Sequence, residues 1–298
     1  MRILLFGYYG YGNMGDEQLL DDTVRLIHEL PVSSSIVVAN GPCSIPFQSF
    51  NRWNLLAWVF QLRSSQGLIF GGGSVFQSKT GMLSLLYYLL IVQLAHMVSC
   101  PVILLCHGWG PFQSLWHERL ASWVLRYAHR SWRLPGPHCF SNDPVFCDLT
   151  LTQPIGSLSR PSGVVGVCMP SSTIDALKQC LESYRIVTLG VSSNDDADES
   201  LHDLWDAQHL SFSYVVTDRF HGAIWASRHG IPWVAVSTDP KLVHLAQSAG
   251  QPCYDTLDQF LLIGLDQPVD GTHLQGWVTS HAAIRPLIKE WLYAAITV

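Results

Sequence analysis

The fold is decided by the stretch RILLFGYYGYGNMGDEQLL, residues 2–20, in which a short apolar run passes through a glycine-rich turn into a helical pattern. The apolar residues at 2–6 predict a strand, and the pattern over 16–30 predicts a helix. A strand joined to a helix by such a turn begins a β-α-β unit. We therefore expect an α/β protein with a parallel sheet that carries helices on both faces.

The same alternation continues along the chain in two series, separated by Pro144, Pro154 and Pro161. The first series predicts strands at 35–39, 67–70 and 102–106 and helices at 53–61, 82–98 and 116–129. The second predicts strands at 163–168, 186–189, 214–217 and 233–237, and helices at 173–184, 199–208, 219–228, 241–248 and 281–295. We predict two Rossmann-like domains facing a cleft, residues 1–155 and 156–298, the second including the closing helix. Ligands should bind at the carboxyl ends of the strands.

The composition excludes several classes of protein. Hydrophobic residues make up 48% of the 298 residues and charged residues only 13%, against about 25% charged residues in a typical soluble domain. This composition argues against disorder. The net charge of −6 argues against nucleic-acid binding as the main activity. The eight cysteines form no C-x-x-C pair and show no metal-ligand spacing, which predicts reduced thiols in a cytosol and no metal site.

The helix predicted at 82–98 raises the question of a membrane, because no Asp, Glu, Lys or Arg lies between Lys79 and Glu118. A membrane-spanning helix needs about 20 apolar residues, and Gln93 and His96 interrupt this one. A strand at 102–106 follows at once. We predict a buried helix followed by a buried strand, in preference to a transmembrane helix. Peripheral contact with a membrane stays open.

The first glycine turn contains Gly10-x-Gly12-x-x-Gly15, which matches the dinucleotide-binding fingerprint. That fingerprint also needs an acidic residue at the end of the second strand, where this sequence has Asn40. The sequence therefore predicts no nucleotide cofactor. Amides at the start of a helix can still bind an anion or a hydroxyl group. The turn residues Gly12, Asn13, Gly15, Asp16 and Glu17 are candidates for acceptor binding.

Two further glycine-rich turns follow predicted strands. Residues 70–77, FGGGSVFQ, end the third strand, and residues 108–112, GWGPF, follow the next one. Glycines in such turns let the backbone approach a ligand closely. We add six residues to the acceptor side: Gly72, Gly73, Ser74, Gln77, Gly108 and Gly110.

Residues 215–224, VVTDRFHGAI, carry the most informative pattern. Asp218 is predicted as a helix N-cap, which places Arg219 and His221 in the first helical turn. A cation there opposes the helix dipole, and a bound anion would compensate for it. Asp239 and Pro240 begin the next helix, with Lys241 in its first turn. The sequence thus predicts an anion site; the alternative is that Arg219 pairs with Asp218 or Asp239 and that Lys241 is solvated.

On these residues the chain resembles the polysaccharide pyruvyl transferase family. The matching pieces occur in the family's order, at 12–17, 70–77, 108–111, 143–146 and 219–241. The resemblance implies a fold like that of the GT-B glycosyltransferases. It implies transfer of the enolpyruvyl unit of phosphoenolpyruvate onto two hydroxyls of a sugar, which gives a pyruvate ketal and phosphate. It also implies a cytosolic location at the inner face of the membrane, where members act on lipid-linked cell-wall precursors.

The resemblance further implies that His221 and Lys241 match family positions for donor binding or catalysis, with Arg133 the counterpart of a family arginine. The family's Arg-Asp pair reads Arg133-Leu134 here, and Met169-Pro170 stands where the family usually has an arginine. Arg219 and Lys241 suit the anionic donor, and His221 suits acid–base catalysis. Asp239 completes the predicted donor site.

Two alternatives remain. One is a GT-B glycosyltransferase that uses a nucleotide sugar at the same helix starts. The other is a non-catalytic partner in glycan assembly, which the missing arginines would favour. The expected partners are phosphoenolpyruvate and a glycan or glycolipid acceptor, while homo-oligomerisation stays open.

Overall fold

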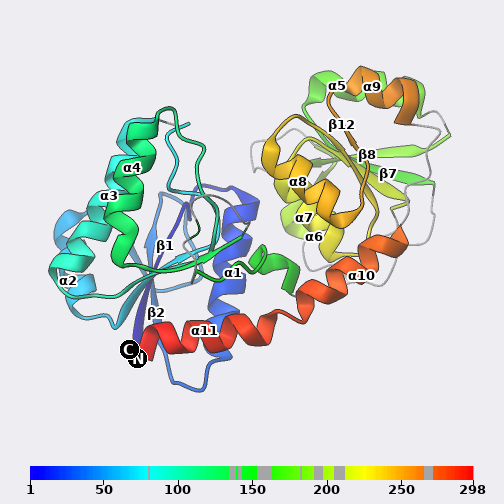
Figure 1. Cartoon of the computed structure of the whole chain (residues 1–298). Coiled ribbons are helices and arrows are strands. Elements are labelled where there is room, and N and C mark those ends of the chain that lie inside the picture. The colour runs from blue at the N-terminus through cyan, green and yellow to red at the C-terminus, as the bar shows by residue number, and fades with distance from the viewer. Residues whose placement is uncertain are drawn as a thin grey trace. The chain divides into compact units, whose positions relative to one another are not determined.

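The computed structural model describes residues 1–79, 81–133, 139, 143–152, 163–181, 183–190, 197–204, 212–264 and 271–297. The chain forms two compact units (Figure 1). Unit 1 is Met1–Leu149 with Ile284–Val298, and unit 2 is Thr150–Ala283. The predicted boundary at residue 155 lies outside the described residues, six residues after Leu149.

The sheet of unit 1 has six strands, all parallel. Their order is β3 (Ser49–Asn51), β2 (Ser35–Asn40), β1 (Arg2–Phe6), β4 (Gly67–Gly71), β5 (Val102–His107) and β6 (His129–Trp132). This is the doubly wound order 3-2-1-4-5-6, in which the chain changes direction across the sheet between β1 and β4. The strands expected at 2–6, 35–39, 67–70 and 102–106 are confirmed. The short edge strands β3 and β6 were not predicted.

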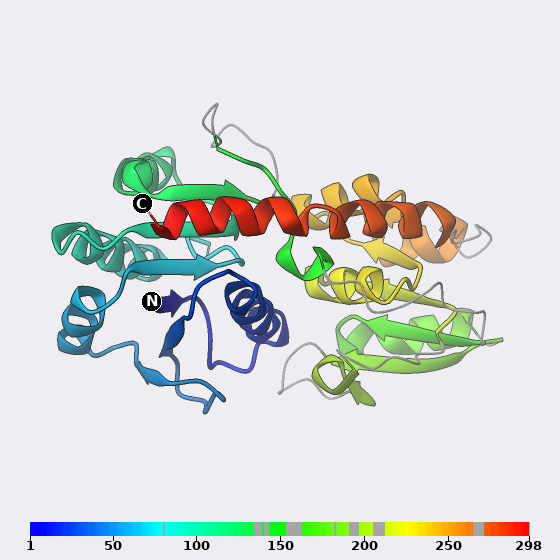
Figure 2. The ribbon, with the colours of Figure 1, turned by 90° about the horizontal axis from the view of Figure 1, so that it is seen from below.

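Helices cover both faces of this sheet (Figure 1). One face packs on α2 (Leu55–Arg63), α3 (Met82–Met97) and α4 (Leu115–Val124), which runs into the 3₁₀ turn η1 (Leu125–Tyr127). The other face packs on α1 (Met14–His28) and α11 (Arg285–Thr297). Figure 2 shows α11, drawn in red, running along the unit 1 sheet.

The position of α11 corrects the domain prediction. Its buried residues Ile288, Leu292 and Ile296 join the core between α1 and the sheet of unit 1. Arg285 also donates a hydrogen bond to Glu29 at the end of α1, at 2.6 Å. The closing helix therefore belongs with the N-terminal sheet, because its apolar face completes that core.

The sheet of unit 2 repeats the same order. It runs β12 (Cys253–Tyr254), β11 (Trp233–Val236), β10 (Tyr214–Thr217), β7 (Val164–Cys168), β8 (Arg185–Gly190) and β9 (Glu199–Ser200), all parallel. The chain changes direction between β7 and β10. Two Rossmann-like units, the predicted fold class, are thus confirmed.

The helices of unit 2 follow its strands. They are α5 (Ser171–Cys180), α6 (Leu201–Leu204), α7 (Phe220–Arg228), α8 (Pro240–Ala249), α9 (Leu257–Gln259) and α10 (Gly271–Ala282), with the π-helical turn η3 (Phe260–Gly264). The helix predicted at 199–208 is wrong in its first two residues, which form β9. Helix α10 was not predicted.

Among the described residues, no helix is long and apolar enough to cross a membrane. Helix α3 has 16 residues, and its Leu85, Leu89 and Val92 are buried against the sheet. The predicted buried strand, β5, is confirmed, whereas the helix before it is buried only on the side that faces the sheet, and Leu83 and Met97 on its other side are exposed.

Candidate functional site

The first candidate site lies at the carboxyl ends of β7, β10 and β11 in unit 2, which include the place where the strand order reverses. Thr217, the last residue of β10, lies opposite Cys168 of β7 and Ala235 of β11. Its hydroxyl donates to the Cys168 carbonyl at 3.2 Å and accepts from the Arg219 amide at 2.9 Å. The strand end thereby fixes the backbone of Arg219, and open α/β sheets bind ligands at this position.

Arg219 and Asp218 form an ion pair, with Arg219 Nε 3.3 Å from Asp218 Oδ1. This is one of the two pairs that the sequence left open. The Arg219 side chain is 55% exposed, so the guanidinium also faces solvent. Burial raises the pKa of Asp218 above its ordinary value, although the charge of Arg219 acts in the opposite direction.

The start of α7 corrects one prediction. Arg219, not Asp218, occupies the N-cap position, and no side chain caps this helix. The Asp218 amide continues the pairing with β7 by donating to the Cys168 carbonyl at 3.3 Å, and Arg219 is still extended, with φ −105° and ψ 129°, so the helix begins one residue later than predicted. The helix therefore starts with a cation at its cap and His221 in its first turn. An anion at this end of α7 would complement both the helix dipole and the arginine.

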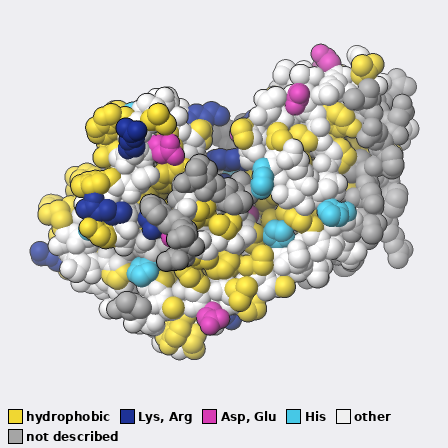
Figure 3. Space-filling view, viewed as in Figure 1, with side chains coloured by type: hydrophobic (Ala, Val, Ile, Leu, Met, Phe, Trp, Pro, Cys, Tyr) yellow, Lys and Arg dark blue, Asp and Glu magenta, His cyan; other side chains and the backbone are white. Residues whose placement is uncertain are grey.

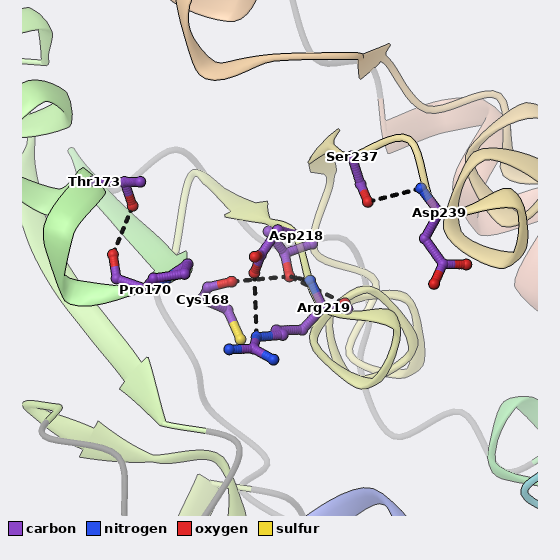
Figure 4. A network of polar contacts seen from close by, with 8 residues as sticks. Cys168, Pro170, Thr173, Asp218, Arg219, Ser237 and Asp239 are labelled. Carbon is purple, nitrogen blue, oxygen red and sulfur yellow. Dashed lines mark hydrogen bonds and ion pairs between the residues drawn. The ribbon is translucent and has the colours of Figure 1, made fainter. Parts of the chain in front are cut away.

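The neighbouring helix α8 begins as predicted. Asp239 is its N-cap and accepts from the Lys241 amide at 2.9 Å, while the Asp239 amide donates to Ser237 Oγ at 3.1 Å (Figure 4). His221 and Lys241 hold equivalent places in the first turns of α7 and α8, and both are partly buried. The structure thus brings Arg219, His221, Lys241 and Asp239 to the ends of two paired strands, β10 and β11.

In unit 1 the backbone amides of the first glycine turn bind a carboxylate of the protein itself, that of Glu17. Glu17 accepts hydrogen bonds from the amides of Gly10, at 2.7 Å, and Tyr11, at 3.2 Å, and the Gly12 amide also bonds to it. Burial raises the pKa of Glu17, and these amides oppose the rise. A phosphate would have to displace Glu17 from this turn, so the turn is occupied by the protein itself.

The end of β2 gives a second reason against a dinucleotide. A Cβ atom at Gly10 would collide with the side chain of Asn40, which is buried and donates to the Cys43 carbonyl at 2.6 Å. The place where a ribose would need an acidic partner is thus filled by packed protein. Asn13 caps α1 by accepting from the Gly15 amide.

The second cluster of unit 1 joins the glycine triplet to Arg133. The Arg133 guanidinium donates to Asp148 at 2.9 Å and to Ser74 Oγ at 3.1 Å. The side chains of Arg133 and Asp148 are 5% and 3% exposed. A Cβ at Gly108 would collide with Ser74 Oγ, and Gly73 has a positive φ of 72° beside the Asp16 carboxylate. Position 108 therefore requires glycine, because the Ser74 side chain lies too close for a Cβ atom.

The other predicted acceptor residues lie in the same loops. Gly72 has a φ of 68°, and its amide donates to the Leu105 carbonyl. Gly110 donates to the Phe76 carbonyl, and Gln77 follows in the loop after β4. Arg133 belongs to this unit 1 group, whereas Arg219, His221, Lys241 and Asp239 belong to unit 2. Its assignment as a donor-binding residue stays a prediction.

Sequence reasoning missed Arg52, which follows β3 and is 2% exposed. Its guanidinium donates to the Gly7 carbonyl at 2.9 Å and to the Tyr88 hydroxyl at 2.8 Å. It lies over the rings of Phe6, Tyr11, Trp53, Tyr87 and Tyr88 at 4.8–5.6 Å from their centroids. Nothing in the local pattern predicts this, because the aromatic partners come from four separate segments.

Exposed aromatic rings stand next to this arginine. Tyr8 and Tyr11 stack in parallel at 4.3 Å, with an interplanar angle of 9°, and Tyr8 and Trp53 are 43% and 62% exposed. All three lie at the carboxyl end of the unit 1 sheet. Flat exposed rings of this kind can pack against the apolar faces of sugars.

No group of His, Cys, Asp or Glu among the described residues could hold a metal ion. Asp195, Asp196 and Asp198 lie close together in the sequence, but Asp198 accepts from the amide and hydroxyl of Thr188, at 2.9 Å each. Asp195 and Asp196 lie outside the described residues. The seven cysteines whose side chains the structure describes are all free thiols.

The sequence matches no protein-family model and no curated protein. Solved structures are nevertheless similar in fold over the whole chain. HepE of Anabaena in complex with UDP is 12% identical, with 100% of each chain covered and a TM-score of 0.58. A UGT transferase from Siraitia grosvenorii in complex with UDP is 10% identical, covering 100% of this chain and 99% of its own, with a TM-score of 0.56.

MnaA of S. aureus in complex with UDP is 10% identical, covering 93% of this chain and 90% of its own, with a TM-score of 0.52. At these identities the comparisons show the fold alone. That fold is the GT-B type, built from two Rossmann-like units, as expected.

Proposed function

We propose that the protein is a transferase of glycan biosynthesis, and that its donor is phosphoenolpyruvate bound at the carboxyl end of the unit 2 sheet. The observation that carries this proposal is the position of Arg219, His221 and Lys241 at the starts of α7 and α8, on two paired strands. The resemblance of residues 12–17, 70–77 and 219–241 to the pyruvyl transferases supports the choice of donor.

The chemistry of the donor suits these side chains. Phosphoenolpyruvate carries a phosphate and a carboxylate on a three-carbon unit, so a small site with two cations can neutralise it. Arg219 can bind either group with two parallel hydrogen bonds, and Lys241 supplies a point charge. The uncapped start of α7 adds its partial positive charge.

His221 supplies the proton. In the proposed reaction, one sugar hydroxyl adds to C2 of the donor while C3 accepts a proton and becomes a methyl group. The second hydroxyl then attacks C2, the C2–O bond to phosphate breaks, and phosphate leaves with its electron pair. Each hydroxyl loses one proton: the first is delivered to C3 and the second to the departing phosphate, so a single imidazole that accepts and donates in turn can serve both steps.

The acceptor is assigned to unit 1. The stacked rings of Tyr8 and Tyr11 and the exposed ring of Trp53 support a carbohydrate ligand, because they offer apolar faces beside polar loops. The Asp16 carboxylate beside Gly73 can accept hydrogen bonds from sugar hydroxyls.

A nucleotide sugar is the second candidate donor. The specific observation in its favour is that structures of the same fold, HepE and the Siraitia transferase, are complexes with UDP. At sequence identities of 12% and 10%, these similarities support a shared fold but not a shared ligand. In this chain both carboxylates at the unit 2 site are engaged: Asp218 forms an ion pair with Arg219, and Asp239 accepts a hydrogen bond from the Lys241 amide at the start of α8.

Thermal unfolding with added ligand separates the two donors, because a ligand that binds only the folded state raises its stability. We expect phosphoenolpyruvate to raise the melting temperature and UDP-glucose to leave it unchanged. The rise should disappear in Lys241→Ala and persist in Lys178→Ala, an exposed lysine on α5. A rise with UDP-glucose alone would replace the first donor with the second.

His221 is tested by turnover, measured as release of phosphate in the presence of glycan acceptors. We expect His221→Ala to bind phosphoenolpyruvate but to release phosphate at least about 100-fold more slowly, the usual contribution of a general acid–base group. His244→Ala, an exposed histidine on α8, is the matched control. Equal rates in the two variants would exclude His221 as the proton donor.

A further inference from the structure

The outer surface of the helix layer α2–α3–α4 in unit 1 is unusually apolar. Helix α3 contacts α2 on one side and α4 on the other, and all three cover the same face of the sheet. Large hydrophobic side chains on the opposite, solvent-facing side are 37–84% exposed: Leu55, Leu56, Phe60, Met82, Leu83, Leu86, Leu90, Met97, Leu115, Trp116, Trp123 and Tyr127. We call this set the outer helix face.

Helix α3 forms the centre of this face. Its buried residues Leu85, Leu89 and Val92 point to the sheet, while Leu83, Leu86 and Leu90 are exposed. The exposed leucines follow one another at spacings of three and four residues, so they form a stripe on the side away from the core. A surface helix normally carries polar residues there. The apolar stripe therefore indicates that something apolar covers it.

Helix α4 and η1 add aromatic and basic side chains. Trp116, Arg119 and Trp123 are exposed at spacings of three and four residues, which places them on one side of α4. The Arg126 guanidinium lies 4.6 Å from the Trp123 ring and 4.5 Å from the Tyr127 ring. Tryptophan, tyrosine and arginine together are typical of the boundary between lipid headgroups and acyl chains.

The charge of this region is opposite to that of the rest of the chain. Residues 53–130 contain five Lys and Arg and one acidic residue, a net charge of +4, whereas the remaining 12 bases and 22 acids give −10. One of the five, Arg130, pairs with Asp143, which leaves four bases against Glu118. The one acid, Glu118, accepts a hydrogen bond from the Trp109 indole at 3.0 Å. Figure 3 shows hydrophobic side chains beside Lys and Arg over the region of these helices.

We propose that the outer helix face docks the protein on an anionic phospholipid bilayer, with its leucines and tryptophans in the interface and Arg63, Lys79, Arg119 and Arg126 at the headgroups. Apolar burial and attraction to anionic lipid act together on such a surface. A second copy of the chain fits less well, because a two-fold contact would place this basic face against itself. The inference stands independently of the proposed donor and acceptor.

Flotation with vesicles tests the proposal on the full chain. We expect the protein to float with vesicles of phosphatidylglycerol and phosphatidylcholine, and much less with phosphatidylcholine alone. Arg119→Gln and Arg126→Gln should each weaken binding about fivefold, the effect of one basic residue near an anionic surface. High salt should weaken binding in the same way.

The apolar component is tested with a matched pair of variants. Leu83 in α3 is 83% exposed, and Leu262 in unit 2 is 81% exposed. Leu83→Glu should bind phosphatidylglycerol vesicles at least about tenfold more weakly than wild type, because a carboxylate would enter the interface. Leu262→Glu should bind as wild type does. Circular dichroism checks that both variants are folded.

Three results would overturn the proposal. The first is no flotation of the wild-type protein with anionic vesicles. The second is equal binding by Leu83→Glu and Leu262→Glu. The third is a concentration-dependent dimer in sedimentation analysis that Leu83→Glu disrupts, without vesicle binding, because the outer helix face would then be an interface between copies of the chain.

Discussion

The buried pair of Arg133 and Asp148 allows a prediction that separates a structural role from a role at the donor site. The pair is 2.9 Å apart, and its side chains are 5% and 3% exposed, so solvent screens it little. Arg133→Met leaves the Asp148 carboxylate buried without its cation. Breaking a buried pair from one side costs about 3–5 kcal/mol, and we expect a loss of that size in the free energy of unfolding.

Removing both charges should have a smaller effect. The double variant Arg133→Met with Asp148→Leu fills the same space with apolar groups, and such replacements are often close to neutral. We expect it to recover most of the stability that Arg133→Met loses. Because each single replacement leaves one charge buried and the double replacement leaves none, the coupling energy in the double-mutant cycle should be at least about 3 kcal/mol. Urea unfolding followed by tryptophan fluorescence measures it, since Trp132 is adjacent and buried.

The same variants test the donor assignment. If Arg133 contacts phosphoenolpyruvate, the double variant regains stability but keeps a raised KM for the donor. Full activity in a stable double variant would show that Arg133 only supports the loops around Ser74. Additive losses in the two single variants, with no coupling, would refute the reasoning about the ion pair itself.

Three further predictions concern unit 1. Gly108→Ala should lose about 1–3 kcal/mol of stability in urea unfolding, because its Cβ meets a packed side chain, whereas Gly276→Ala in α10, with open space around it, should lose none. Glu29→Gln should cost about 0.5–1 kcal/mol at pH 7, since half-exposed ion pairs contribute little. Arg285 lowers the pKa of Glu29, so this difference should vanish as the pH falls below 4.5 through the lowered pKa. Glu17→Ala should lose about 2–4 kcal/mol because backbone amides lose their acceptor, and Glu17→Gln should lose less. Burial raises the pKa of Glu17, so wild type should gain stability relative to Glu17→Gln as the pH falls through that raised pKa, and a pH-independent difference would contradict this.

The sequence predicted the central strands of both sheets because each is a run of buried apolar residues next to a glycine or a cap. It did not predict the edge strands β3 and β6, whose sequences SFN and HRSW are short and partly polar. Their backbone follows the neighbouring strand and not a local preference. The periodicity of residues 281–295 predicted a helix, but periodicity does not say which core a helix completes.

The site was predictable where local rules apply. Asp239, Pro240 and Lys241 lie as expected because capping depends on neighbouring residues only. The cap of α7 was predicted one residue too early, because the Asp218 amide still pairs with Cys168, 50 positions earlier in the sequence, and the backbone stays extended through Arg219. Arg52 escaped notice for the same reason, since distant segments of the chain build its surroundings.

The two units share one strand order, yet α1 of unit 1 and α7 of unit 2 start in opposite ways. In unit 1, Glu17 accepts from the amides of the turn that precedes α1, and Asn13 accepts from the Gly15 amide at the start of the helix, so the protein supplies its own anion. In unit 2, α7 starts at Arg219 without a side-chain cap, beside Lys241 on the next helix. An external anion is therefore favoured in unit 2 and opposed in unit 1. This contrast supports assigning the anionic donor to unit 2 and the uncharged hydroxyls of a sugar to unit 1.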